Sequence, residues 1–320
     1  MAKIVSLCIE NFRGIHRLSI EFDPKQNVFC FVGRGDSGKS TILDAISFAL
    51  SPSWNLSFHD TDFHQCDVSN PIKIEISLID VPDTLLRESK YGLHARRMSL
   101  QGAGISDEVI SNIEDAGPLV LTISLVVDAT LEPSWSVTND RPQEDKPINA
   151  ADRAQLNCYL VSDYLDRHFS WNKGNPLNAL QNLIEGSSDL QSSNVIVESL
   201  REAKSVIDEN EFEQLKNATA KVAQQAALLG FNMKETKTTL DFKDLYVRDN
   251  RVSLHQEKIP LRLMGKGSRR LASMAIQTAL AQNGGIVLVD EVEQGLEPDR
   301  VKNLVRALCE VTGGQVFVTT

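Results

Sequence analysis

The sequence predicts an α/β protein in which its two ends fold together and a mainly helical segment is inserted between them. The residues 27–32 and 285–291 each contain a short, solidly apolar run, which is typical of strands buried on both faces. The residues 195–229 contain no Pro and are rich in Ala, Glu, Lys and Gln, which favours long helices. We therefore expect three ranges: 1–149 and 231–320 as the two parts of one head, and 150–230 as a helical insertion.

The first range is expected to hold most of the strands. Alternating apolar residues predict strands over 3–9 and 18–22, joined by a turn at 11–14, and further strands over 72–79 and 119–127. Helical spacing of apolar residues predicts a helix over 42–50, ending before Pro52. The residues 130–149, rich in Pro, Asp and Glu, are expected to form a loop.

The rest of the chain is expected to return from helix to mixed structure. The residues 150–230 are predicted to be mostly helical. The expected elements after them are short strands at 238–242, 245–247 and 251–254, a helix at 269–281, a strand at 285–291, a helix at 299–312 and a strand at 315–320.

Composition narrows the classes of function. The formal net charge of −10 and a pI near 5.2 oppose binding to the DNA backbone except through a local basic patch or a partner. The 5 cysteines are scattered without a CxxC pair, which indicates a cytoplasmic protein with reduced thiols. No apolar run approaches the roughly 18 residues that cross a membrane.

A phosphate-binding loop is the strongest motif. It fits G-x-x-x-x-G-K-[ST], and it follows a predicted strand and precedes a predicted helix, as the motif requires. Backbone N–H groups of such a loop bind phosphate oxygens, its Lys reaches the outer phosphates, and its Ser ligates Mg²⁺. The sequence therefore predicts binding of ATP and Mg²⁺ by Gly33, Arg34, Gly35, Asp36, Ser37, Gly38, Lys39, Ser40 and Thr41.

A pair of carboxylates ends the apolar strand near the other end of the chain. Asp290 occupies the position from which phosphate-loop enzymes orient the Mg²⁺ shell. The adjacent Glu291 is suited to accept a proton from an attacking water. We therefore predict Glu291 and Lys39 as the catalytic residues, with Ser40 and Asp290 at the metal.

These motifs resemble those of a known group of ATPases. The opening IENFRG, the loop GRGDSGKST and the tail VLVDEVEQGLEP are similar to the ABC-type ATPase heads of the SMC, RecF and OLD (overcoming lysogenization defect) families. The sequences FHDTDF at 58–63 and GSRRL at 267–271 resemble the OLD group most. The resemblance implies an ABC-type P-loop ATPase head with mixed sheets and an inserted, mainly helical dimerisation arm.

The resemblance also implies roles for three further residues. It places Arg13 near the nucleotide, Asp62 at the metal, where a residue senses Mg²⁺ and water, and Ser268 against the γ-phosphate held by a second subunit. The alternatives are that Arg13 anchors a turn and that Asp62 caps a loop. Relatives continue past the last strand with a switch His and, in OLD proteins, a Toprim nuclease domain. We therefore expect a chain ending at Thr320 to hydrolyse ATP weakly and to show no nuclease activity alone.

Three functions are compatible with these observations. The first is a homodimeric ATPase that controls an effector nuclease or a downstream Toprim domain in DNA processing or anti-phage defence, with DNA reached through a partner and no membrane involved. The second is a scaffold that holds ATP without hydrolysing it. The third, a metal-dependent nuclease, would have to use His59, Asp60, Asp62 and His64, whose position after the phosphate loop fits ATP sensing better.

Overall fold

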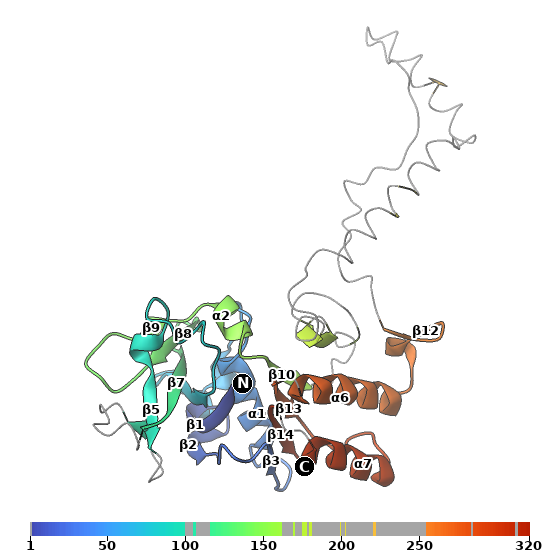
Figure 1. The fold of residues 1–320 in the computed structure, drawn as a ribbon, viewed down its shortest axis with the longest axis horizontal. Coiled ribbons are helices and arrows are strands. Elements are labelled where there is room, and N and C mark those ends of the chain that lie inside the picture. The colour runs from blue at the N-terminus through green and yellow to red at the C-terminus, as the bar shows by residue number, and fades with distance from the viewer. Residues whose placement is uncertain are drawn as a thin grey trace.

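Two β-sheets lie on either side of one helix in the computed structural model, and two further helices cover the outer face of the smaller sheet (Figure 1). The structure describes residues 2–99, 105–106, 116–161, 169, 175–177, 179–180, 199, 202, 220–221, 254–282, 284–310 and 313–320.

The larger sheet is antiparallel and, within the described residues, has eight strands. These strands are β1 (Lys3–Phe12), β2 (Ile15–Glu21), β4 (Ile72–Ile79), β5 (Arg96–Ser99), β6 (Ile105–Ser106), β7 (Ala116–Val127), β8 (Pro133–Thr138) and β9 (Lys146–Pro147). Their order is β2-β1-β4-β7-β5-β6, with β8 between β7 and β9.

The smaller sheet is parallel and joins distant parts of the sequence. Its strands are β3 (Val28–Phe31), β10 (Cys158–Val161), β13 (Ile286–Val289) and β14 (Gln315–Thr319), in the order β10-β13-β14-β3. Alternate residues of a strand point to opposite faces. Leu288 and Phe317 accordingly belong to the core around the central helix, whereas Val289 and Val318 belong to the core on the outer face.

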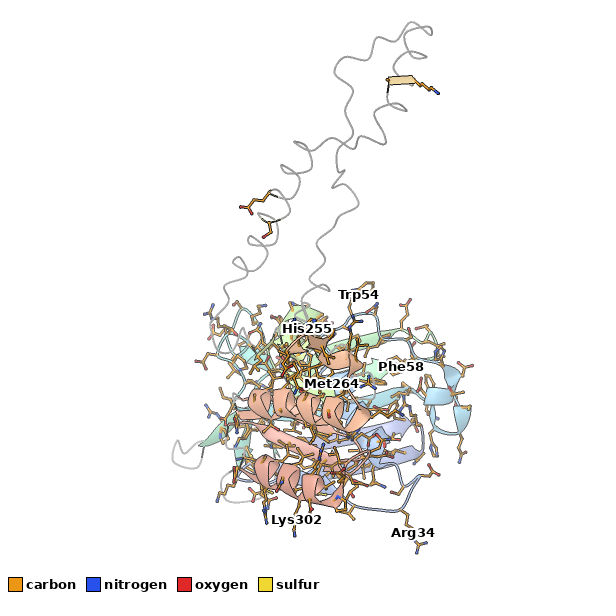
Figure 2. The ribbon with its side chains drawn as sticks, turned by 90° about the vertical axis from the view of Figure 1, so that its right-hand side faces the viewer. Arg34, Trp54, Phe58, His255, Met264 and Lys302 are labelled. Atoms are coloured by element: carbon orange, nitrogen blue, oxygen red, sulfur yellow. The ribbon has the colours of Figure 1, made fainter. Side chains whose placement is uncertain are left out.

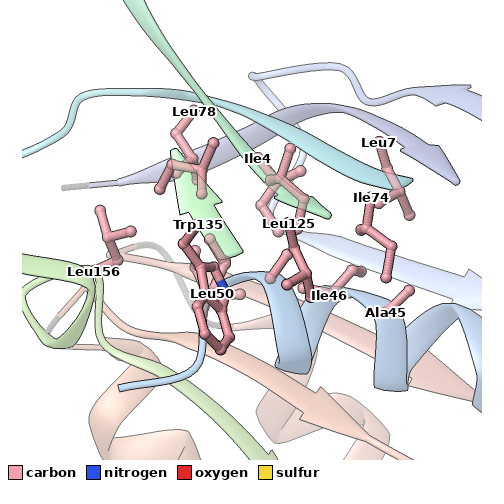
Figure 3. Packing of buried hydrophobic residues seen from close by; sticks show 14 of the residues in the cluster. Ile4, Leu7, Ala45, Ile46, Leu50, Ile74, Leu78, Leu125, Trp135 and Leu156 are labelled. Atoms are coloured by element: carbon pink, nitrogen blue, oxygen red, sulfur yellow. The ribbon is translucent and has the colours of Figure 1, made fainter. Parts of the chain in front are cut away.

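The central helix is α1 (Lys39–Ala49), and it buries Leu43, Ala45, Ile46 and Ala49. Figure 3 shows Ile46 and Leu50 packed among side chains of the larger sheet, including Leu125 and Trp135. The outer face of the smaller sheet packs against α6 (Lys266–Gln282) and α7 (Pro298–Cys309). Short elements complete the described chain: α2 (Ala150–Ala154), the pair β11 (His255–Gln256) and β12 (Ile259–Pro260), and 3₁₀ turns at Asp60–Asp62, His64–Cys66, Gly92–His94 and Leu261–Leu263.

Most of the described elements match the sequence predictions, and two predictions are wrong. The expected loop at 130–149 contains β8 and β9, because Trp135 and Val137 pair with β7 and bury their side chains against the core. The residues 158–161 were expected to be helical but form β10, because their position beside β13 supplies a complete set of parallel backbone partners.

The helix predicted over 195–229 lies outside the described residues apart from isolated positions, as do the strands predicted at 238–242, 245–247 and 251–253. The division into 1–149, 150–230 and 231–320 therefore stays a prediction.

Candidate functional site

The predicted phosphate loop connects β3 to α1 as a tightly curled turn. Gly38 precedes the helix with φ 85°, a left-handed conformation that favours glycine. A Cβ at Gly33 would lie 2.8 Å from Ser37 Oγ, so only glycine fits there without a shift. Lys39 Nζ donates hydrogen bonds of 2.8 Å to the carbonyls of Gly33 and Arg34. The loop carbonyls therefore hold the Lys39 ammonium group in place beside the start of α1.

Residues from the two ends of the chain meet at the first turn of α1. Ser40 Oγ donates to Asp290 Oδ1 at 3.0 Å, and Thr319 Oγ1 donates to the same oxygen at 2.6 Å. Asp290 follows β13 and Thr319 ends β14, so the neighbouring parallel strands bring both residues to one edge of the sheet. This contact unites the two predicted halves of the site.

A cleft of about 660 Å³ opens in front of these residues. Its lining includes nine of the predicted site residues and, in addition, Thr319. The nine are Gly33, Gly35, Asp36, Ser37, Gly38, Lys39, Ser40, Thr41 and Glu291. Gly14, Ile15, Glu293 and Thr320 complete its lining. Of the other predicted nucleotide ligands, Arg13, Arg34 and Ser268 do not line this cleft. Figure 2 shows Arg34 extending away from the body of the molecule.

Arg13 lies beside the cleft and is held by two carboxylates. Its Nε donates to Asp62 Oδ1 at 2.9 Å, and its Nη1 donates to Asp44 Oδ2 at 2.5 Å. Its guanidinium also lies over the rings of Phe12 and Phe48, 4.9 and 5.7 Å from their centroids. These contacts account for its position without a nucleotide, and its predicted role near the nucleotide stays a prediction.

Burial and the contacts between Arg13 and its carboxylates shift the pKa values of these groups in opposite directions. Burial by itself lowers the pKa of Arg13, but the hydrogen bonds to Asp62 and Asp44 outweigh it and raise that pKa. Burial raises the pKa of Asp44 despite its contact with Arg13, and the charges of Asp290 and Asp62 raise it further. Asp44 therefore lies close enough to Asp290, the aspartate predicted to bind metal, to feel its charge.

Asp62, predicted at the metal, is hydrogen-bonded to Arg13 and to its own segment. Its second oxygen accepts from the backbone N–H of His59 at 3.0 Å, and its carbonyl accepts from the N–H of Arg13 at 2.7 Å. His64 Nδ1 lies 2.9 Å from the Arg13 carbonyl. The segment 59–64 thus packs against Arg13. Among the described residues, no group of three or more His, Cys, Asp or Glu side chains has the arrangement of a metal site.

The donors at the first turn of α1 suit a magnesium ion bound together with a nucleotide. Mg²⁺ prefers oxygen ligands, and in nucleotide enzymes it takes only one or two from the protein. The Ser40 hydroxyl and the Asp290 carboxylate, 3.0 Å apart, supply such a pair. The curled loop and the N-terminus of α1 suit the phosphate groups.

Three site residues were missed by sequence reasoning. Asp44 had a signal, since it follows Ser40 by one helical turn and shares its face of α1. Arg270 had one too, because it shares a face of α6 with the apolar Met274, four residues later. Thr319 had none, because only the pairing of β14 with β13 places its hydroxyl at Asp290.

The fold is that of an ABC-type P-loop ATPase head. Residues 2–114 match a family model described as "AAA ATPase domain", and residues 241–320 match one described as "AAA domain, putative AbiEii toxin, Type IV TA system". These matches support ATPase activity at a general level. The resemblance to the OLD group in particular stays a prediction.

Relatives and solved structures agree with this class. The chain is 24% identical over 376 residues to the "Retron Ec83 probable ATPase" of Escherichia coli, covering 99% of this chain and 68% of the relative. The fold is similar to that of an SMC head bound to the C-terminal winged-helix domain of ScpA, with a TM-score of 0.50, 16% identity, and coverage of 99% of this chain and 89% of that one. It is also similar to the recombination mediator RecF with ATP, with a TM-score of 0.52, 13% identity, and coverage of 100% and 93%.

No helix among the described residues has both the length and the apolar character needed to cross a membrane.

Proposed function

We propose that this chain is a dimeric ATPase that binds and hydrolyses Mg-ATP and thereby controls an effector in DNA processing or anti-phage defence. The observation that carries the proposal is the contact of Ser40 with Asp290, 3.0 Å apart, at the edge of a cleft that Lys39 and Glu291 also line. These are the four positions that a phosphate-loop ATPase needs for phosphate, metal and water.

The residues of the loop would bind the triphosphate. Lys39 would exchange its bonds to the carbonyls of Gly33 and Arg34 for contacts with the outer phosphates. Ser40 and Asp290 would hold Mg²⁺, which when bound neutralises the developing charge on the phosphates. Asp290 is kept in place for this role by the Thr319 hydroxyl, 2.6 Å away.

Glu291 would act as the general base. It follows Asp290 at the end of β13 and lines the same cleft, where it can accept a proton from a water placed opposite the γ-phosphate. A carboxylate in this position adds about 10²–10⁴-fold to the rate when it is well placed.

A second copy of the chain would complete the site. Ser268, in the first turn of α6, does not line the cleft of its own chain, and no acidic residue occupies that turn. A helix N-terminus with Lys266 and Arg269 nearby suits a phosphate group. Ile259 and Leu263 are 57% and 68% exposed just before α6, and apolar surface of this kind favours a protein contact. We assign the dimerisation arm to residues 150–230.

The link to an effector rests on the relatives. The retron relative carries the name "probable ATPase", one fold neighbour is a recombination mediator, and another is a head bound to a partner protein. These names support a role in defence or DNA processing with a protein partner. The acidic net charge of −10 favours contact with DNA through that partner.

The test is phosphate release from ATP by the purified protein, compared with that of Glu291→Gln. The variant should bind ATP as the original does and release phosphate about 10²–10⁴-fold more slowly. Glu132→Gln, the same change on an exposed loop, should behave as the original protein. If the original protein binds ATP but shows no turnover above background, the chain is an ATP-held scaffold and the proposal is wrong.

A further inference from the structure

The backbone at the proposed general base has an unusual conformation. Glu291 has φ 46°, in the left-handed region that residues other than glycine seldom occupy. Such a conformation costs free energy and persists only where neighbouring groups hold it. The groups that hold the peptide units on each side of Glu291 therefore decide where its carboxylate points.

One group comes from β14. The Thr319 hydroxyl accepts from the N–H of Glu291 at 2.8 Å and donates to Asp290 Oδ1 at 2.6 Å. The Thr319 carbonyl accepts from the N–H of Val292 at 3.0 Å. A single buried threonine thus fixes the N–H groups on both sides of Glu291 and the adjacent metal-binding carboxylate.

The other group comes from α6. Arg270 is 5% exposed, and its Nη2 donates to the carbonyls of Asp290 and Glu291 at 2.6 and 2.5 Å. Its Nη1 donates to the side chain of Gln294 at 2.9 Å. The planar guanidinium can reach three acceptors at once because its donors form a fixed fork, which a lysine ammonium lacks. Arg270 therefore binds the carbonyl groups around Glu291, whereas Thr319 binds the N–H groups.

The helix α6 also contacts the segment that follows Glu291 at a second point. A Cβ at Gly267 would lie 3.2 Å from the Gly295 carbonyl, so the first turn of α6 packs closely on that segment. Ser268 stands between this contact and Arg270 on one helix. A shift of the N-terminus of α6 would therefore be transmitted to the backbone of Glu291.

We propose that Arg270 and Thr319 are positioning residues that together hold Glu291 in its left-handed conformation, and that Arg270 links this conformation to the position of α6. Neither side chain needs to touch the nucleotide for this role. The inference rests on the proposed function, since it assigns the regulation of the proposed base to the helix that carries Ser268.

The first test is Arg270→Lys, which keeps the charge but loses the fork. Displacement of a reacting group by about 1 Å can cost up to about 100-fold in rate. We expect kcat to fall by about 10- to 100-fold, with the Kd for ATP and the melting temperature close to those of the original protein. Arg306→Lys, the same change at an exposed position of α7, should leave all three unchanged.

The decisive comparison is made in the Glu291→Gln background, by single-turnover release of labelled phosphate. If Arg270 acts by placing Glu291, the double variant should match Glu291→Gln within about threefold, because residues that act as one unit are not additive. A merely structural role would lower the rate in both backgrounds. A double variant slower than Glu291→Gln by tenfold or more, or Arg270→Lys with unchanged kcat, would overturn the inference.

Thr319 gives an independent test should Arg270→Lys fail to fold. Thr319→Val keeps the shape and removes the hydroxyl, whereas Thr319→Ser keeps the hydroxyl. The valine variant should lose kcat, because both the N–H of Glu291 and the carboxylate of Asp290 lose the hydroxyl that holds them, and the serine variant should retain it. Equal rates for the two variants would overturn the inference. An original protein without any ATP turnover would instead overturn the proposed function, which is a different outcome.

Discussion

The side chain of Gln315, at the start of β14, forms a pair of hydrogen bonds with the backbone of Ile4 in β1. Its Oε1 accepts from the Ile4 N–H at 2.6 Å, and its Nε2 donates to the Ile4 carbonyl at 3.1 Å. Both residues are 0% exposed. The amide thus imitates a neighbouring strand and joins the parallel sheet to the antiparallel one.

Gln315→Leu should destabilise the fold strongly, because it leaves the two Ile4 groups without these partners in a buried setting. Each buried polar group left unpaired costs about 1–3 kcal/mol. Urea unfolding should show the loss as a lower midpoint at an unchanged slope. Gln143→Leu, at an exposed position, should change the stability by less than about 0.5 kcal/mol. Equal midpoints for the two variants would contradict the role given to Gln315.

Lys39→Ala should remove measurable binding of ATP. The substitution takes away the side-chain cation that lies in the phosphate loop, bonded to the carbonyls of Gly33 and Arg34. Lys302→Ala, at an exposed position of α7 that Figure 2 labels, removes an equal charge far from the loop and should bind ATP normally. Isothermal calorimetry distinguishes the two. An affinity of Lys39→Ala equal to that of the original protein would refute the phosphate loop.

The two carboxylates on Arg13 should differ in their contribution to stability. Asp62 is 14% exposed and also accepts from the N–H of His59, whereas Asp44 is 29% exposed and has its pKa raised, first by burial. Asp62→Asn should therefore cost more free energy of unfolding than Asp44→Asn, for which about 1 kcal/mol or less is expected of a partly exposed ion pair. Urea unfolding of both variants measures the order, and the reverse order would contradict this account.

Asp152 should make the fold sensitive to acid. Burial alone would raise its pKa, but hydrogen bonds from Lys90, Tyr91 and Asn149 outweigh burial and lower the pKa below its ordinary value of 3.8. The unfolded chain therefore takes up a proton at this group before the folded chain does. The stability that Asp152 contributes is present above pH 3.8 and is lost as the pH falls below it toward the folded pKa.

Asp152→Asn should therefore be less stable than the original protein at pH 7, and the difference should shrink as the pH falls below about 4. Denaturant unfolding at a series of pH values between 7 and 3 measures this difference. Asp145→Asn, at an exposed position, serves as the control. A difference that stays constant over the whole series would show that the charge of Asp152 is not the cause.

The parts of the site that follow local rules were predictable from the sequence. The run before Gly33 and the helix after Lys39 have the patterns that a phosphate loop needs, and the structure places both as expected. The same holds for Asp290, which follows an apolar strand. These features depend on neighbours within one element, so periodicity and motif spacing suffice to find them.

The parts that depend on distant partners were not predictable. The strand β10 forms because β13 lies beside it. The prediction of a helix at 158–161 rested on the local sequence, which carries no information about that neighbour. Likewise, the hydrogen bond from Arg270 to the Glu291 carbonyl requires α6 to pack against β13. Arg13 was expected at the nucleotide, but its contacts with Asp44 and Asp62 became visible only once α1 and the segment after it were placed.

The position of β3 has a consequence for the order of folding during synthesis. This strand pairs with β14, and Phe29 stacks on Phe317 with ring centroids 5.0 Å apart. The ribosome makes the phosphate loop early, but the strand that leads into it gains its partner only when β14 emerges. Contacts between such distant segments form slowly, since a long loop must close first. A chain that has not yet reached β14 therefore lacks the strand that pairs with β3, so the nucleotide cleft can form only after β14 has been made.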